Sequence, residues 1–164
     1  MFQAVYYFEA DSLDRALDGD GNNLGLLQII EDYPWTESAN LAHYYAGISL
    51  LKKGEYISAI EHLDQFSSSD LLIRARTYSL IGDANMEMGN YSEAVSWYNK
   101  ARDYKPNENS TPLYLLKAAT AYEMLEDWKS ALECYDIIVT KYVNSGEYQD
   151  ARKHKARVET LVSS

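Results

Sequence analysis

Hydrophobic and small residues recur along the middle of the chain in a fixed order, and the order occurs three times. The central copy is "YSLIGDANMEMGNYSEAVSWYNKARDYKP", residues 78–106. Its recurring positions are Gly82, Gly89, Tyr91, Ala94, Tyr98, Ala101 and Pro106. Similar copies precede it, "YYAGISLLKKGEYISAIEHLDQF", and follow it, "KAATAYEMLEDWKSALECYDII". Self-similarity at a fixed period predicts stacked copies of one structural unit.

Each copy predicts two helices joined by a tight turn. Tyr78, Ile81 and Gly82 lie three and four residues apart, which is the spacing of one helical face. Gly89 follows that helix and suits the left-handed backbone that ends it. We expect Gly82 and Ala94 to be small because the two helices approach closely there, and a larger residue would overpack the contact.

The two ends of the chain continue the helical pattern less regularly. One predicted stripe is Phe2, Tyr6, Ala10, Leu13 and Leu17, and a second is Leu26, Leu27, Ile30 and Tyr33, ending at Pro34. Together they predict a degenerate helical pair over residues 1–34. A last amphipathic helix is expected over residues 147–162, as the polar cap that a solenoid requires.

The three copies resemble the tetratricopeptide repeat family. The resemblance implies an all-α, right-handed superhelix of antiparallel helix pairs in one domain, 1–164, with intact repeats at 40–73, 75–108 and 112–145. This sequence departs from the family pattern at three positions. Asn85 stands where a large apolar residue is usual, and Ala119 and Glu126 replace the two glycines in the third copy.

Net charge narrows the classes of partner. The chain of 164 residues has a net charge of −10, which disfavours binding to a nucleic acid backbone or to anionic lipid. One cysteine excludes an internal disulfide. No apolar run approaches the ~20 residues of a membrane-spanning helix. A protein or peptide segment as the partner is what the family resemblance implies.

The stretch "DGDGNN" offers a weak calcium candidate, because Asp18, Asp20 and Asn22 have the alternate spacing that opens an EF-hand loop. The loop lacks its glycine at the sixth position and its bidentate glutamate at the twelfth, where Ile29 stands. A simpler interpretation is a turn between two helices in which Asn22 or Asn23 caps the second helix. No cofactor or metal is expected.

Catalytic motifs are absent from the sequence. His43, His62 and His154 share no metal-ligand spacing, and no HExxH, CxxC, GxSxG or phosphate-binding loop occurs. Cys134 lies within a predicted helix and is interpreted as a structural thiol. The sequence therefore predicts a protein that is not an enzyme.

The family resemblance implies a concave groove lined by the first helix of each repeat. The implied groove residues are Leu41, Tyr44, Ile48, Leu51, Arg76, Asp83, Met86, Leu113, Leu116, Lys117 and Glu123. The family's clamp for the C-terminal carboxylate of chaperones maps to Tyr44, Ile48, Leu80, Leu113 and Lys117, of which four are apolar, so that mode is not expected. The groove is expected to hold a partner segment. Alternatively, the chain's own terminal helix or a neighbouring subunit of a homodimer fills it.

The order "EADSLDRAL", "DGDGNN", "LGLLQIIEDY" resembles membrane-anchored bacterial envelope proteins of the translocon-associated type. The resemblance implies a scaffold or chaperone-like role. It also implies an upstream anchor that is missing here and a place at the periplasmic face of the inner membrane. Without such an anchor the expected location is cytoplasmic.

Overall fold

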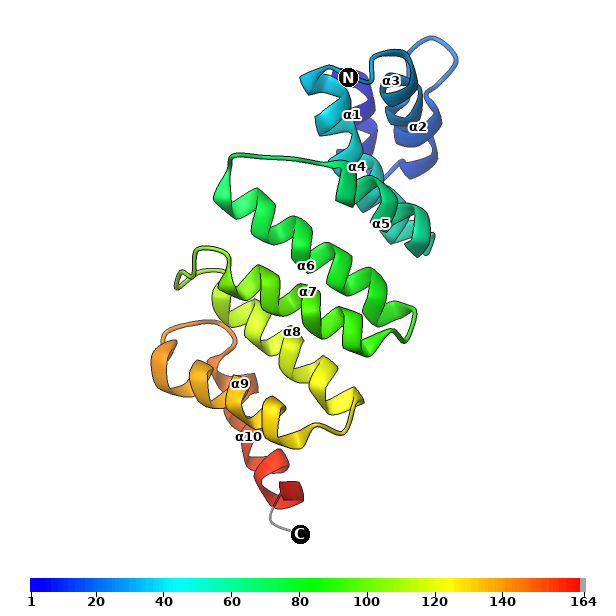
Figure 1. The fold of residues 1–164 in the computed structure, drawn as a ribbon. Helices are drawn as coiled ribbons and strands as arrows, with labels where there is room; N and C mark the ends of the chain where they lie inside the picture. The colour runs from blue at the N-terminus through cyan, green and yellow to red at the C-terminus, as the bar shows by residue number, and fades with distance from the viewer. Residues whose placement is uncertain (163–164) are drawn as a thin grey trace. The chain divides into compact units, whose positions relative to one another are not determined.

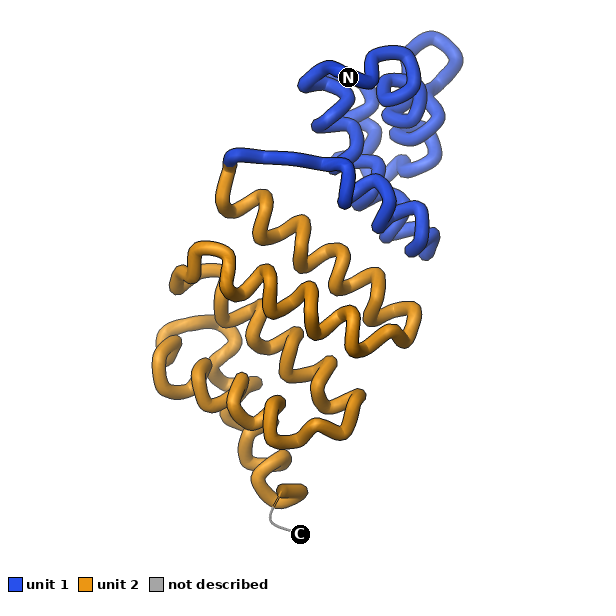
Figure 2. The backbone as a smooth tube through the Cα atoms, viewed as in Figure 1, with its two compact units in different colours: residues 1–69 blue, residues 70–164 orange. Residues whose placement is uncertain are grey.

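The computed structural model describes residues 1–162, which form ten α-helices and, outside them, one isolated bridge between Gly19 and Leu24. The all-α class predicted from the sequence is confirmed. Figure 1 shows successive helices doubling back on one another through short loops. The chain divides into two compact units, residues 1–69 and residues 70–164 (Figure 2), where the sequence predicts one domain.

The first unit contains five helices. They are α1 Phe2–Glu9, α2 Leu13–Asp18, α3 Leu26–Asp32, α4 Glu37–Lys53 and α5 Tyr56–Gln65. Its core is apolar and includes Leu17, Leu26, Ile29 and Leu50. Thr36 caps α4 by accepting a hydrogen bond from the Ala39 N–H, which leaves one fewer unpaired donor at that helix end.

Three helices stand where the sequence predicts one helical pair. The first predicted helix is broken after α1, where Asp11 adopts a left-handed backbone with φ 55°. The predicted stripe is also wrong at its start, because Phe2 is 86% exposed and Tyr6 is 56% exposed. The small residues Ala4 and Ala16 are buried in the core of this unit instead.

The second unit also contains five helices. They are α6 Leu71–Glu87, α7 Tyr91–Asp103, α8 Thr111–Met124, α9 Trp128–Lys141 and α10 Tyr148–Val162. Its main core joins α7 to α10 and includes Leu115, Tyr135, Ile138 and Val158. The pairs α6/α7 and α8/α9 coincide with the second and third predicted repeats, and α10 with the predicted last helix.

The small residues of the repeat pattern lie where helices meet most closely. A Cβ atom on Gly82 would lie 2.6 Å from the Tyr98 ring, and one on Gly47 would lie 2.6 Å from Leu63 Cγ. Gly89 has φ 75°, the left-handed conformation predicted for the turn between α6 and α7. Asn85, unusual for the repeat family, is buried and donates its side-chain amide to the Ile81 carbonyl at 2.9 Å.

None of the helices described within residues 1–162 has the combination of length and apolar composition needed to cross a membrane.

Candidate binding groove

The second unit carries an open pocket between α6 and α8, with a volume of about 530 Å³. Its lining comprises Leu72, Arg76, Ser79, Leu80, Asp83, Asn109, Ser110, Leu113, Tyr114 and Lys117. Four of these, Arg76, Asp83, Leu113 and Lys117, belong to the groove implied by the sequence. Leucines supply the apolar part of the lining, and Leu72 is 61% exposed. The pocket therefore presents solvent-exposed apolar surface beside charged groups.

The inner wall of this pocket is an ion pair between α6 and α8. Lys117 Nζ lies 2.7 Å and 2.8 Å from the two carboxylate oxygens of Asp83 and 3.2 Å from Ser79 Oγ. Tyr98 of α7 donates its hydroxyl to Asp83 Oδ1 at 2.7 Å. Burial, with the neighbouring Asp83 carboxylate, raises the pKa of Tyr98 and keeps the phenol protonated. The charge of Lys117 is thus balanced inside the protein.

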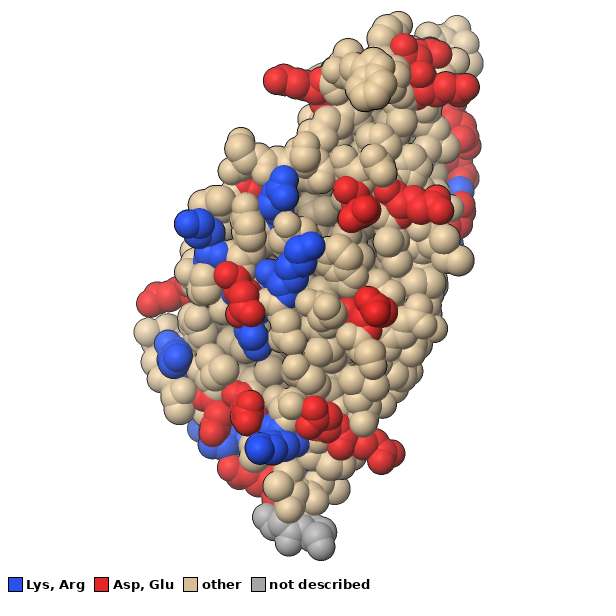
Figure 3. Space-filling view, viewed as in Figure 1, with Lys and Arg blue, Asp and Glu red and all other residues tan. Residues whose placement is uncertain are grey.

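Arg76 differs from Lys117 although both line the same pocket. Its side chain is exposed, and no carboxylate within residues 1–162 forms an ion pair with it. Figure 3 shows Lys and Arg side chains on the part of the second unit that carries α6 to α8. Arg76 therefore leaves an unbalanced positive charge at the pocket.

Glu123 is engaged by the last helix. Tyr135 of α9 donates its hydroxyl to Glu123 Oε1 at 2.6 Å, and Arg157 of α10 pairs with Glu123 Oε2. His154, also on α10, stacks on the Tyr135 ring with centroids 5.7 Å apart. Burial raises the pKa of the Tyr135 phenol, and its bond to Glu123 adds to the effect. The side chain of Glu123, a predicted groove residue of the third repeat, is therefore in contact with the chain's own last helix.

The remaining predicted groove residues of the second unit pack inward. Met86 and Leu116 are partly buried against the core of α7 to α10 rather than in the pocket lining. Conversely, the sequence prediction missed Leu72, Asn109 and Tyr114. Asn109 lies in the loop before α8, and the family register does not assign Leu72 or Tyr114 to the groove. The apolar pattern at the start of α6 was the available signal for Leu72.

The predicted groove residues of the first unit have mixed surroundings. Tyr44 and Ile48 are buried, and the Tyr44 ring packs on Phe66 with centroids 4.9 Å apart. Leu51 is partly buried against the core, whereas Leu41 is 39% exposed. Only Leu41 among the four therefore offers extensive surface within this unit.

The "DGDGNN" loop is organised around Asp20. Its Oδ1 accepts the backbone N–H groups of Asn22 at 2.8 Å and Asn23 at 2.7 Å. Its Oδ2 accepts the Tyr7 hydroxyl at 2.6 Å and the Asn23 side-chain amide at 3.0 Å. These bonds, that from Tyr7 foremost, hold the pKa of Asp20 well below its usual range. Turn chemistry accounts for the carboxylate, and no group of three or more His, Cys, Asp or Glu side chains that could hold a metal ion occurs within residues 1–162.

The capping expected of Asn22 or Asn23 is wrong. The next helix, α3, begins at Leu26 with Gly25 as its N-cap, and no side chain caps it. Asn23 binds Asp20 instead. A Cβ atom on Gly25 would lie 2.1 Å from the Leu17 carbonyl oxygen, so the glycine permits this close crossing of the backbone.

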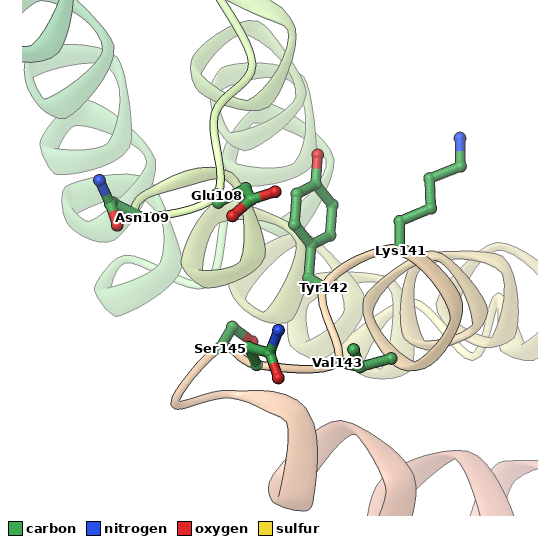
Figure 4. A pocket seen from close by; sticks show the side chains of 7 residues that line it. Glu108, Asn109, Lys141, Tyr142, Val143 and Ser145 are labelled. Carbon is green, nitrogen blue, oxygen red and sulfur yellow. The ribbon is translucent and has the colours of Figure 1, made fainter.

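A second, smaller hollow lies beside the loop that precedes α10. Its lining is Glu108, Asn109, Lys141, Tyr142, Val143, Asn144 and Ser145, and its volume is about 120 Å³. Figure 4 shows Tyr142 between Glu108 and Lys141, whose side chains point in different directions. Four of the labelled side chains come from one stretch of chain, residues 141–145. Five of its seven lining residues are polar or charged, so the hollow offers little apolar surface to a partner.

Cys134 is buried in the core of the second unit. Burial raises the pKa of its thiol to about 11, so the sulfur is protonated at neutral pH. A protonated, buried thiol is a poor nucleophile. This agrees with the structural role expected from the sequence.

The helix pairs, the close contacts at glycine and the three copies define a helical repeat protein. Residues 114–145 match the family model described as Tetratricopeptide repeat. The match covers most of α8 and all of α9, and with the all-helical fold it supports a tetratricopeptide repeat protein. No curated protein matches the chain. Tetratricopeptide repeats are typically non-enzymatic modules for protein–protein interaction.

Proposed function

We propose that the second unit binds a segment of a partner protein in the pocket between α6 and α8. The observation that carries the proposal is the pocket itself, in which exposed leucines adjoin the unbalanced charge of Arg76. Concave sites of this size, mostly apolar with a few polar groups, are where ligands usually bind. The role is that of a scaffold or chaperone-like module, without catalysis.

The leucines would supply most of the affinity. Leu72 and Leu113 are exposed, and a large apolar side chain of the partner would remove their surface from water. Fully burying one such side chain is worth about 1.5–3 kcal/mol before the costs of association. The partner segment is therefore expected to present at least one large aliphatic or aromatic residue.

Arg76 would select the charge of that segment. Lys117 is neutralised by Asp83, so an acidic residue of the partner finds its uncompensated cation at Arg76. Electrostatic complementarity of this kind contributes to specificity more than to affinity. The proposed ligand is a segment with an acidic residue near its apolar anchor.

The test is crosslinking followed by affinity measurement. A photo-reactive residue at Leu113 should capture the partner in cells, whereas the same residue at Ser96, which is exposed on α7, should not. The captured segment is then titrated calorimetrically into the purified chain. Leu113→Ala should weaken binding by about 1 kcal/mol or more.

Arg76→Gln should weaken the same binding, whereas Arg74→Gln should not. Arg74 lies on the same helix but outside the pocket lining, and it bonds to Tyr78. Equal capture at Leu113 and Ser96, or unchanged affinity in Leu113→Ala, would place the binding surface elsewhere.

A second candidate function is self-assembly. Trp35 is 97% exposed and Phe2 86% exposed on the first unit, and large exposed apolar residues are common at interfaces. Arg157 of α10 contacts Glu123, one of the predicted groove residues, which supports filling of the groove by a helix of this chain. Sedimentation velocity at increasing concentration tests the proposal, and a Trp35→Ser variant should reduce any association that is seen.

The proposed location is the bacterial envelope. It is supported by the likeness of the first forty residues to anchored envelope proteins and not by the fold. Fractionation of cells that produce the full-length gene product from its native locus tests it. Recovery solely in the soluble cytoplasmic fraction would refute the proposed location but would not bear on the proposed binding pocket.

A further inference from the structure

His43 of α4 and His62 of α5 form a pair of imidazoles in the first unit. Their Nδ1 atoms lie 3.0 Å apart, and the ring centroids are 5.1 Å apart. Both side chains are half-buried, so the pair is neither sealed in the core nor loose on the surface. The only two imidazoles of this repeat thus face each other across its helix pair.

The same two positions hold different residues in the other repeats. In the second repeat they are Tyr78 and Trp97, whose rings pack with centroids 5.8 Å apart. In the third they are Leu115 and Cys134, both buried in the core. Aromatic or apolar side chains therefore suffice to join the helices at this position. The imidazoles of the first repeat add donor chemistry that the packing itself does not require.

The spacing of the two nitrogens suits a shared cation. A transition-metal ion about 2.0–2.1 Å from each nitrogen would see the pair at an angle of about 90–100°. That is the angle between neighbouring ligands in square-planar or octahedral coordination, which Cu²⁺ and Ni²⁺ prefer. Tetrahedral Zn²⁺ would need the nitrogens slightly farther apart.

The protonation states also suit a metal. Burial lowers the pKa of both histidines, so each ring is neutral at pH 7 and above. In the observed pair one Nδ1–H donates to the other Nδ1. Binding a cation requires that the donor ring carry its proton on Nε2, with no net loss of a proton, and that both rings turn so that their Nδ1 lone pairs point at the ion instead of at each other. Glu61 on α5 lies near His62 and adds negative potential there.

We propose that His43 and His62 form a two-imidazole site for Cu²⁺ or Ni²⁺, with water completing the coordination. Residues 1–162 hold no larger cluster of potential ligands, so the site is exchangeable rather than a permanent structural centre. Copper binds more tightly than nickel, as expected for nitrogen ligands. The bound ion links α4 to α5 across the first repeat.

The test is calorimetric titration of the full chain with CuCl₂ at pH 7.4, with electron paramagnetic resonance of the copper-loaded protein. The expected result is one Cu²⁺ per chain, with hyperfine structure from two nitrogens. His43→Gln and His62→Gln should each lower the affinity about tenfold or more, because one of two protein ligands is lost. His154→Gln removes the third histidine as a matched control and should leave the affinity unchanged.

A double variant guards against misfolding. His43→Tyr with His62→Trp installs the pair that the second repeat uses at these positions, so the helix contact is kept while both ligands are removed. It should fold, as judged by circular dichroism, and lose the two-nitrogen signal. Wild-type copper affinity in either single variant, or an equal loss in His154→Gln, would overturn the proposal.

Discussion

The two units join their helices by different chemistry. In the second unit, a carboxylate on one helix accepts a hydrogen bond from a tyrosine hydroxyl on the next helix. The same carboxylate forms an ion pair with a Lys or Arg side chain on the helix after that. Asp83 does so with Tyr98 and Lys117, and Glu123 with Tyr135 and Arg157. In the first unit, Leu63 stands at the position of Tyr98 and packs against Gly47. No such joint occurs there among the described residues.

The two units also differ in net charge. Residues 1–69 contain eleven acidic and three basic side chains, a net charge of −8, whereas residues 70–164 contain fourteen and twelve, a net charge of −2. Partly buried charges need partners, and the nearly equal numbers of both signs in the second unit supply them between helices. The ion pairs of the first unit, such as Lys52 with Asp11 and Lys53 with Asp14, involve largely exposed carboxylates. The same repeat pattern therefore allows either apolar or polar contacts between its helices, depending on the local balance of charge.

Deleting apolar volume should have the largest effect, and a similar one in both units. Leu63→Ala and Ile138→Ala each remove a fully buried side chain, so each should lower the free energy of unfolding by about 2–5 kcal/mol. Urea denaturation followed by circular dichroism measures it. Ile57→Ala, on an exposed part of α5, is the control. Losses below 1 kcal/mol would mean that these positions do not carry the cores.

Filling the close helix contact at Gly82 should have the next largest effect. Gly82→Val would force a side chain into the Tyr98 ring, and we expect a loss of about 1–3 kcal/mol in the free energy of unfolding. Gly146→Val is the matched control, because a Cβ atom there meets nothing within 4 Å. Equal denaturation midpoints for the two variants would contradict the close approach.

Removing the tyrosine hydroxyls should have a smaller effect, confined to the second unit. Tyr98→Phe and Tyr135→Phe each take a donor from a partly buried carboxylate, with an expected loss of about 1–2 kcal/mol. Thermal unfolding by calorimetry measures it. Tyr33→Phe, at a half-exposed ring of the first unit, should be silent. An unchanged stability in all three variants would show that the tyrosine–carboxylate hydrogen bonds do not stabilise the fold.

The smallest effect should be a pH dependence in the first unit. Asp20 has its pKa lowered from 3.8 by hydrogen bonds, Tyr7 foremost, so it stabilises the folded state above that pH and the contribution fades as pH falls below it. Tyr7→Phe should therefore be less stable than wild type at pH 7, with the difference shrinking below pH 4. Urea denaturation at pH 7, 5 and 3 follows it, and a pH-independent difference would assign the effect to packing.

The repeat pattern predicted the paired helices well because its small residues mark physical necessities, such as the space beside Gly82 that the Tyr98 ring fills. The start of the chain was predicted poorly. A helical stripe through Phe2 and Tyr6 assumes one continuous helix, and Asp11 breaks it. Periodicity alone gives no sign of a break at a residue that is neither glycine nor proline.

The lining of the pocket overlaps the predicted groove residues only in part, for a related reason. Arg76 and Leu113 follow the family register and line the pocket, but Asn109 comes from a loop whose course no register gives. Lys117 and Asp83 are far apart in sequence, and their ion pair leaves Arg76 as the cation of the pocket that has no carboxylate partner among residues 1–162. That distinction decides the chemistry of the pocket, and composition cannot supply it.

The contact between Glu123 and Arg157 has a consequence for engineering. Because it repeats the arrangement of Asp83 with Lys117, α10 docks on the third repeat as the first helix of a further repeat would. A grafted repeat that keeps an arginine at the position of Arg157 should be accepted at the same junction. The array could thus be lengthened as a tool, with one acid–base pair acting as its connector.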